Sequence, residues 1–236
     1  MALVVLLALV ASAGMLAALR LLLRWVRRRH RYSPWPEVGW LTPEESPLGR
    51  RVLDCRGYCK LMPGPPRDKI VERFQALRRM SLEQLRDCLP EGSDPAGYEL
   101  SWDFNEGEAL RLRAGFHATD VEDRWLIRYA HGRLYFQRSW TGVLVYVAEI
   151  RPEHGGARLT RLWLRGSDSA CPEQRLLHIA IVRYLIDSHL LGRLAAVPVP
   201  SDLASEPLKM ALFAFSIAGR RGEYAEPFYP DSAPPH

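Results

Sequence analysis

The sequence contains none of the short motifs that mark the common catalytic and nucleotide-binding sites. It has no G-x-S-x-G nucleophile elbow, no Walker loop and no G-x-G-x-x-G loop, so these routes to a hydrolase or a nucleotide-binding enzyme are not indicated. Lysine is also scarce, because only 3 of the 32 basic residues are lysine. We interpret this arginine bias as genomic composition rather than as a sign of function.

Cysteine is too rare and too irregularly spaced for a disulfide framework or a zinc site. The four cysteines lie at positions 55, 59, 88 and 171. Only Cys55 and Cys59 are close in sequence, and no second pair of cysteines or histidines follows at ligand spacing. We therefore predict free thiols in a reducing compartment, with no bound metal and no cofactor.

One long uncharged run begins the chain. Residues 2–19 carry no charged side chain, and the apolar run resumes after Arg20 and continues to Leu23. A helix of this length would measure about 33 Å, enough to cross a hydrocarbon core of about 30 Å. Five arginines between residues 24 and 31 should stay in the cytoplasm by the positive-inside rule. We predict that residues 1–31 are a single-pass anchor in the bacterial inner membrane, with the C-terminal domain in the cytoplasm.

A cleaved signal peptide is the alternative to this anchor, and it would leave an exported, periplasmic domain. Ala11-Ser12-Ala13 has the small residues of a cleavage site, but no positive region precedes the apolar run. The lipid bilayer is the partner that the basic cluster indicates. Residues 32–236 carry 26 basic and 27 acidic side chains, and this balance gives no reason to expect nucleic acid binding.

The remaining chain is expected to contain a spacer, one folded domain and a tail. Seven prolines indicate a mostly extended spacer over residues 32–66, because proline is excluded from helix interiors and central strands. Helical periodicity occurs at 67–89, 172–191 and 208–218, and strand-like runs occur at 98–104, 109–113, 122–130, 133–140, 143–150 and 158–165. This order predicts an α+β domain over 67–226, an antiparallel meander sheet covered by helices, with a loose tail at 227–236.

Two glycine-containing dipeptides predict the register of the sheet. His131-Gly132 and Thr141-Gly142 each lie between strand-like runs, as two-residue hairpin turns require. This register places Trp125 opposite Arg138, with Asp123 diagonal to Arg138 on one apolar face. We interpret the pair as a buried ion pair stacked on the Trp125 ring. The alternative is a pocket in which Arg138 recognises a carboxylate or a phosphate. The reverse face of the hairpin should be partly solvated.

His117 and Asp120 precede this hairpin and form a small titratable cluster with Glu122 and Asp123. Such groups can bind a metal or act as an acid and a base, although a solvated loop with Asp120 capping a turn explains the same pattern. The candidate binding residues are therefore Arg138, Asp123, Trp125, His117 and Asp120. No residue is assigned as catalytic or as a metal ligand.

The stretch from Asp123 to Trp125, followed by Arg138-Ser139-Trp140-Thr141-Gly142, resembles a segment of uncharacterised bacterial proteins in which D-R-W precedes an aromatic-rich R-S-W-T-G strand. The resemblance implies that these residues form one structural unit, and it implies no known activity. We expect a membrane-anchored cytoplasmic binding or accessory module, with a protein as a possible partner. The alternatives are a small hydrolytic enzyme that uses this cluster on an anionic substrate, or an exported domain.

Overall fold

The computed structural model describes residues 38–62, 72, 75–77, 81–119, 123–166 and 171–230. The predicted anchor at residues 1–31 and most of the helix predicted at 67–80 lie outside these residues. Within the described ranges, no helix is both long enough and apolar enough to span a bilayer.

Five antiparallel strands form the larger sheet, sheet B, in the order β3-β7-β6-β5-β4. Its strands are β3 Tyr98–Asn105, β4 Trp125–Ala130, β5 Arg133–Arg138, β6 Leu144–Glu153 and β7 Gly156–Leu164. Strands β4 to β7 follow one another as a meander, and β3 pairs with the outer edge of β7. The prediction of an α+β fold with an antiparallel sheet is confirmed.

One predicted strand is instead a helix. Residues 109–113 belong to α4, Glu106–Ala114, because a capping box starts a helix here. The Asn105 side chain accepts the backbone N–H of Glu108, and the Glu108 carboxylate accepts that of Asn105, both at 3.0 Å. This reciprocal cap satisfies two otherwise unpaired donors. The alternation of leucine and arginine over residues 110–113 was therefore a misleading strand signal.

A second sheet, sheet A, was not predicted. Its strands are β1 Gly39–Leu41, β2 Val52–Asp54, β8 Val197–Pro200 and β9 Tyr224–Phe228, in the order β1-β2-β9-β8. The stretch expected to be a spacer thus contributes β1, β2 and the helix α2, Arg56–Leu61, to the folded domain. Val52 and Leu53 are fully buried. The prolines are tolerated because Pro43 and Pro47 lie in the turns between β1 and β2.

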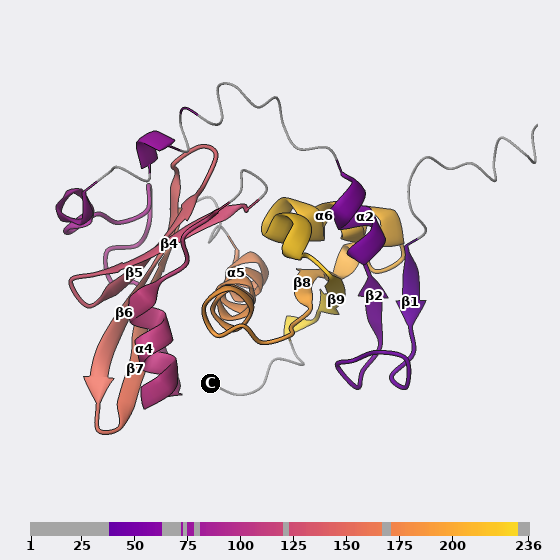
Figure 1. Ribbon diagram of the computed structural model, residues 1–236, viewed down its shortest axis with the longest axis horizontal. Coiled ribbons are helices and arrows are strands. Elements are labelled where there is room, and N and C mark those ends of the chain that lie inside the picture. Colours follow the sequence, from indigo (N-terminus) through magenta and orange to yellow (C-terminus); the bar gives the residue numbers. More distant parts are fainter. Residues whose placement is uncertain are drawn as a thin grey trace, which may run out of the picture. The chain divides into compact units, whose positions relative to one another are not determined.

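The two helices predicted in the C-terminal half are confirmed. Helix α5, Pro172–Leu185, continues into a π-helical turn, η3 Ile186–Leu190, and α6 spans Pro207–Ala218. Gly192 and Gly219, which follow them, have φ of 67° and 61°, the left-handed conformation in which helices commonly end. Short 3-10 turns, η4 Ser201–Leu203 and η5 Gly219–Arg221, flank α6. Figure 1 shows α5 between sheet B and sheet A, and the main core contains side chains from both sheets.

The predicted hairpin register is right at the first turn and wrong at the second. His131 and Gly132 have φ of 51° and 75°, as a type I′ turn requires, and Trp125 pairs with Arg138. The second connection is a four-residue loop, because the Arg138 N–H donates to the carbonyl of Val143 at 2.9 Å. A bulge follows, so Val147 lies opposite Tyr135 rather than Phe136. The hydroxyl of Ser139 is bonded to the Asp123 carbonyl, which holds this end of the loop to the chain before β4.

The face of sheet B that points away from α5, here called the outer face, is partly solvated at Arg133, as predicted, but it is more buried than expected at Tyr135. Tyr135, Val147 and Trp163 form a second apolar cluster there with Leu85 and Ala130. Leu85 belongs to the 3-10 helix η1, Leu82–Leu85, which begins at a capping box between Ser81 and Gln84. The outer face is therefore covered around Leu85, whereas Glu99, Ser101 and Asp103 of β3 remain exposed.

Candidate functional site

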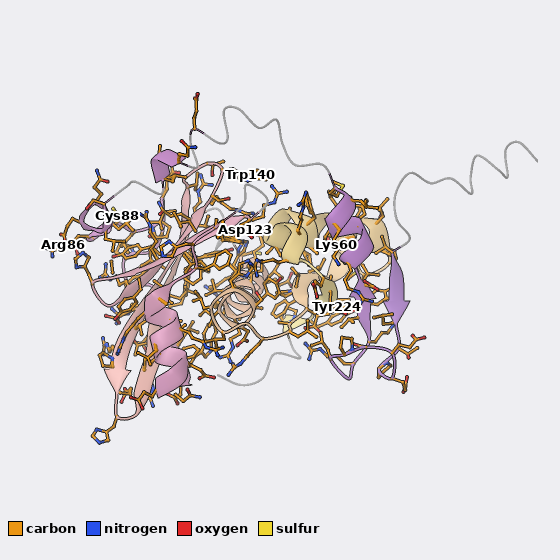
Figure 2. All side chains as sticks on the ribbon, viewed as in Figure 1. Lys60, Arg86, Cys88, Asp123, Trp140 and Tyr224 are labelled. Atoms are coloured by element: carbon orange, nitrogen blue, oxygen red, sulfur yellow. The ribbon has the colours of Figure 1, made fainter. Side chains whose placement is uncertain are left out.

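The predicted site residues near Asp123 do not form one site with Arg138. Asp120 lies outside the described residues, and His117 is exposed. The buried Asp123 carboxylate accepts the backbone N–H of Thr119 at 3.0 Å and lies 3.2 Å from Nε of Arg221. Figure 2 places Asp123 on the side of sheet B that faces α6. Asp123 therefore accepts a hydrogen bond from Thr119 and pairs with Arg221 of η5.

Arg138 and Trp125 bind the end of helix α6. Nη1 of Arg138 donates to the carbonyls of Ser216 at 3.0 Å and Ile217 at 3.4 Å, and the Trp125 indole donates to Ile217 at 2.6 Å. A cation at this position meets the negative end of the helix dipole. The guanidinium lies 4.4 Å from the centre of the Trp125 ring, so the predicted stacking is confirmed. The Arg138 guanidinium binds helix carbonyls, and Asp123 lies 3.2 Å from Nε of Arg221.

A cavity of about 210 Å³ opens on the outer face of sheet B. We call it the outer cavity, and it is lined by Asp87, His131, Gly132, Arg133, Tyr135, Glu149, Ile150 and Arg151. These residues come from the segment after η1, the turn between β4 and β5, and the strands β5 and β6. Figure 2 shows Arg86 and Cys88, the neighbours of Asp87, on the side of sheet B away from α5. The cavity therefore lies on the opposite face from Asp123.

Tyr135 brings a buried hydroxyl without a hydrogen bond to this cavity. Its side chain is fully buried, and its Oη makes no hydrogen bond within 3.5 Å, although the Arg133 guanidinium is close enough to interact with it. Burial raises the pKa of Tyr135, and the neighbouring Arg133 guanidinium opposes this only in part, so the hydroxyl keeps its proton at neutral pH. Leaving such a group unbonded costs about 1–3 kcal/mol. A ligand oxygen in the cavity would remove this cost.

Arg133 adds a second donor to the same wall. It lies two residues before Tyr135 on β5, so strand alternation places both side chains on the outer face. In the described part of the chain no ion pair includes Arg133, and its guanidinium lies 5.1 Å from the centre of the Trp163 ring. A phenol O–H and an arginine N–H side by side are suited to an acceptor such as a carboxylate or a phosphate.

On the β6 wall of the cavity, the charged side chains already have partners within the protein. Nη2 of Arg151 lies 3.2 Å from the Glu149 carboxylate, which also accepts the Thr160 hydroxyl at 2.8 Å. His131 Nε2 lies 3.6 Å from a carboxylate oxygen of Glu83 at the rim. Among the described residues, no three histidine, cysteine or acidic side chains form a metal-binding group.

Two lining residues hold an uncommon backbone conformation. Asp87 and His131 have φ of 61° and 51°, and they are the non-glycine residues with positive φ in the described ranges. This conformation costs a residue with a side chain roughly 1–2 kcal/mol, and such residues concentrate at functional sites. His131 adopts it as the first central residue of the type I′ turn, and aspartate is among the residues that tolerate it.

Sequence reasoning missed Arg133, Tyr135 and Asp87 as site residues. The available signal was the composition of the outer face, where Tyr135, Val147 and Trp163 lie on three neighbouring strands. A face with this many large apolar side chains must be covered. All four cysteines are free thiols, as predicted. Comparison with family models, curated proteins and solved structures gave no match for this chain.

Proposed function

We propose that this chain is a membrane-anchored binding module whose α+β domain takes a small molecule with a carboxylate or a phosphate into the outer cavity. The supporting observation is the buried Tyr135 hydroxyl, which makes no hydrogen bond within 3.5 Å and interacts with the neighbouring Arg133 guanidinium. The volume of about 210 Å³ is below the range of about 300–1,000 Å³ that is usual for drug-sized ligands. The ligand is therefore small.

The hydrolytic alternative draws less support from the described residues. Arg138 is bound to the carbonyls that end α6, and the Asp123 carboxylate is bound to Arg221. His117, the intended acid or base, is exposed on the surface. A general acid or base needs a substrate within hydrogen-bond reach, and Arg138 and Asp123 are engaged in contacts within the protein.

Calorimetric titration of the full chain in detergent with leucine, 4-methylpentanoate and inorganic phosphate tests the binding proposal. At least one of these probes should bind. Tyr135→Phe, which removes only the hydroxyl, should weaken that binding about 5-fold to 10-fold, the effect of one hydrogen bond. Arg133→Met should weaken it about 10-fold to 100-fold, because a charged donor is lost.

Tyr129→Phe provides the matched control, since it removes a tyrosine hydroxyl from β4, whereas the cavity is lined from β5 and β6. Its affinity for each probe should equal that of the wild type. Equal affinities in the wild type, Tyr135→Phe and Arg133→Met would reject the outer cavity as the binding site.

The anchor in this proposal rests on the uncharged run at residues 2–19 and the arginine cluster that follows it. The full chain is expected in the membrane pellet after an alkaline carbonate wash, and deletion of residues 1–31 should release it. Alkaline phosphatase fused after His236 should be inactive, because the basic flank resists translocation. Full-length protein in the soluble fraction would contradict the anchor, and an active fusion would contradict the cytoplasmic location.

A further inference from the structure

The outer cavity has as many negative as positive formal charges in its lining. Asp87 and Glu149 are acidic, and Arg133 and Arg151 are basic. A site for phosphate or for a dicarboxylate is expected to have an excess of positive side chains, because all the charged groups of such a ligand are negative. The balanced lining therefore disfavours a ligand that has anionic groups alone.

One positive and one negative charge of this lining neutralise each other inside the protein. Arg151 lies 3.2 Å from Glu149, and Thr160 donates to the same carboxylate. The other two charges, on Asp87 and Arg133, do not pair: in the ranges that the structure describes, neither residue takes part in an ion pair. Opposite charges that line one cavity without contacting each other can each bind one end of the same ligand.

The backbone of Asp87 supports a role for its carboxylate. Its φ of 61° is the conformation that glycine adopts most readily, yet an aspartate occupies the position. The carboxylate also lies near enough to the Tyr135 hydroxyl to act on its ionisation, although burial is the main cause. Asp87 and Tyr135 therefore face a shared space from two separate segments of the chain.

We infer that the outer cavity binds an α-amino acid or another small aminocarboxylate, with its carboxylate on Tyr135 and Arg133 and its ammonium on Asp87. The inference rests on the proposed function, because it names the ligand class of the same site. The donors on β5 match the two oxygens of a carboxylate, and the Asp87 oxygens match the three N–H groups of an ammonium. A volume of about 210 Å³ holds roughly seven water molecules at about 30 Å³ each, which is the size range of an amino acid.

The test compares three probes that share one carbon skeleton, in calorimetric titrations of the full chain in detergent. Leucine carries both charges, 4-methylpentanoate lacks the ammonium, and 3-methylbutylamine lacks the carboxylate. Leucine is expected to bind at least 10-fold more tightly than either of the others, since each loses one charged contact. Asp87→Asn should remove most of the preference for leucine over 4-methylpentanoate. Asparagine tolerates positive φ, so this variant keeps the backbone.

Asp202→Asn, an identical change at an exposed position in η4, should retain the full preference and serves as the control. If 4-methylpentanoate binds as tightly as leucine, or if only inorganic phosphate binds, the aminocarboxylate inference is overturned while the proposed function stands. Unchanged preference in Asp87→Asn would also overturn the inference. If Tyr135→Phe and Arg133→Met leave all binding unchanged, the proposed function fails as well.

Discussion

The free energy of unfolding is expected to fall by about 1.4 kcal/mol per pH unit between roughly pH 6 and pH 4 because of one residue, His189. This side chain is buried in η3, with Nδ1 2.7 Å from the Ser188 hydroxyl and Nε2 without a hydrogen bond. Burial lowers the pKa of His189 to about 3 from a usual value of 6.5, Arg221 adds to the effect, and Asp123 opposes it.

The direction of the effect follows from these two pKa values. Because the pKa of His189 is lower in the folded state, the unfolded chain binds the proton first as the pH falls. The stabilisation is therefore complete above about pH 6.5 and is lost progressively as the pH falls towards 3. Near pH 4.5 the loss from this residue alone should reach roughly 2–3 kcal/mol, a large part of a typical domain stability.

Urea unfolding at pH 7.0, 5.5 and 4.5 checks this expectation when the wild type is compared with His189→Phe. Phe116 and Tyr184 lie against the His189 ring, at 4.9 and 6.1 Å between ring centres, so phenylalanine retains the aromatic packing. The free energy of unfolding of His189→Phe should fall less steeply with falling pH. The difference in slope should correspond to the uptake of about one proton fewer on unfolding. His154→Gln, at an exposed turn position, should follow the wild type. Equal pH slopes in the wild type and His189→Phe would refute the role of His189.

Gly156→Ala is expected to destabilise the domain by about 3 kcal/mol or more, while the same change at the adjacent Gly155 costs about 1–2 kcal/mol. A Cβ added at Gly156 would lie 1.9 Å from the backbone oxygen of Phe104 in β3. That oxygen belongs to the paired strand and cannot move without breaking the edge of sheet B. At Gly155, φ is 81° but no atom lies within 4 Å of an added Cβ. The loss of stability in Gly156→Ala therefore measures a steric clash, and the loss in Gly155→Ala measures the strain of positive φ.

Thermal melts of the two variants, together with hydrogen exchange of the β3 amides, measure both effects. Gly156→Ala should lower Tm more than Gly155→Ala and should speed exchange along Tyr98–Asn105. Gly155→Ala should leave exchange in β3 close to that of the wild type. A larger loss of stability at Gly155 than at Gly156 would show that the close approach of β7 to β3 is not the limiting contact.

Elements with local signals were predictable from the sequence. His131-Gly132 supplied two residues suited to a type I′ turn, which set the register of β4 and β5. Gly192 and Gly219 similarly marked where the helical segments end. In each of these cases the residues that specify the structure are adjacent in the chain, so periodicity and turn chemistry were sufficient.

Sheet A could not be predicted in this way, because its strands are short and their partners are remote. β2 contains three residues, and its inner partner β9 comes from the other end of the domain. Such strands are stabilised by pairing and burial rather than by a local pattern. The prolines that suggested a spacer include Pro43 and Pro47, which lie in the turns between β1 and β2 and not in the strands.

The candidate site was only partly within reach of sequence reasoning. Arg138 and Trp125 were correctly placed together, but the partner of Arg138 depends on where α6 ends in space. Tyr135 and Arg133 were assigned to a solvated face, because nothing near β5 shows that η1 covers it. The outer cavity thus depends on a segment that is distant in sequence, and local patterns do not report such contacts.

The strand order of sheet A sets a limit on folding during synthesis. β9 lies between β2 and β8, and Leu53 of β2 pairs with Ala225 of β9. Ribosomes add about 5–20 residues per second, so the roughly 170 residues between these partners take on the order of 10–30 s to translate. Throughout that interval β2 can pair only with β1, so its other edge waits for β9. The nascent chain thus depends on protection from aggregation until its last strand leaves the exit tunnel.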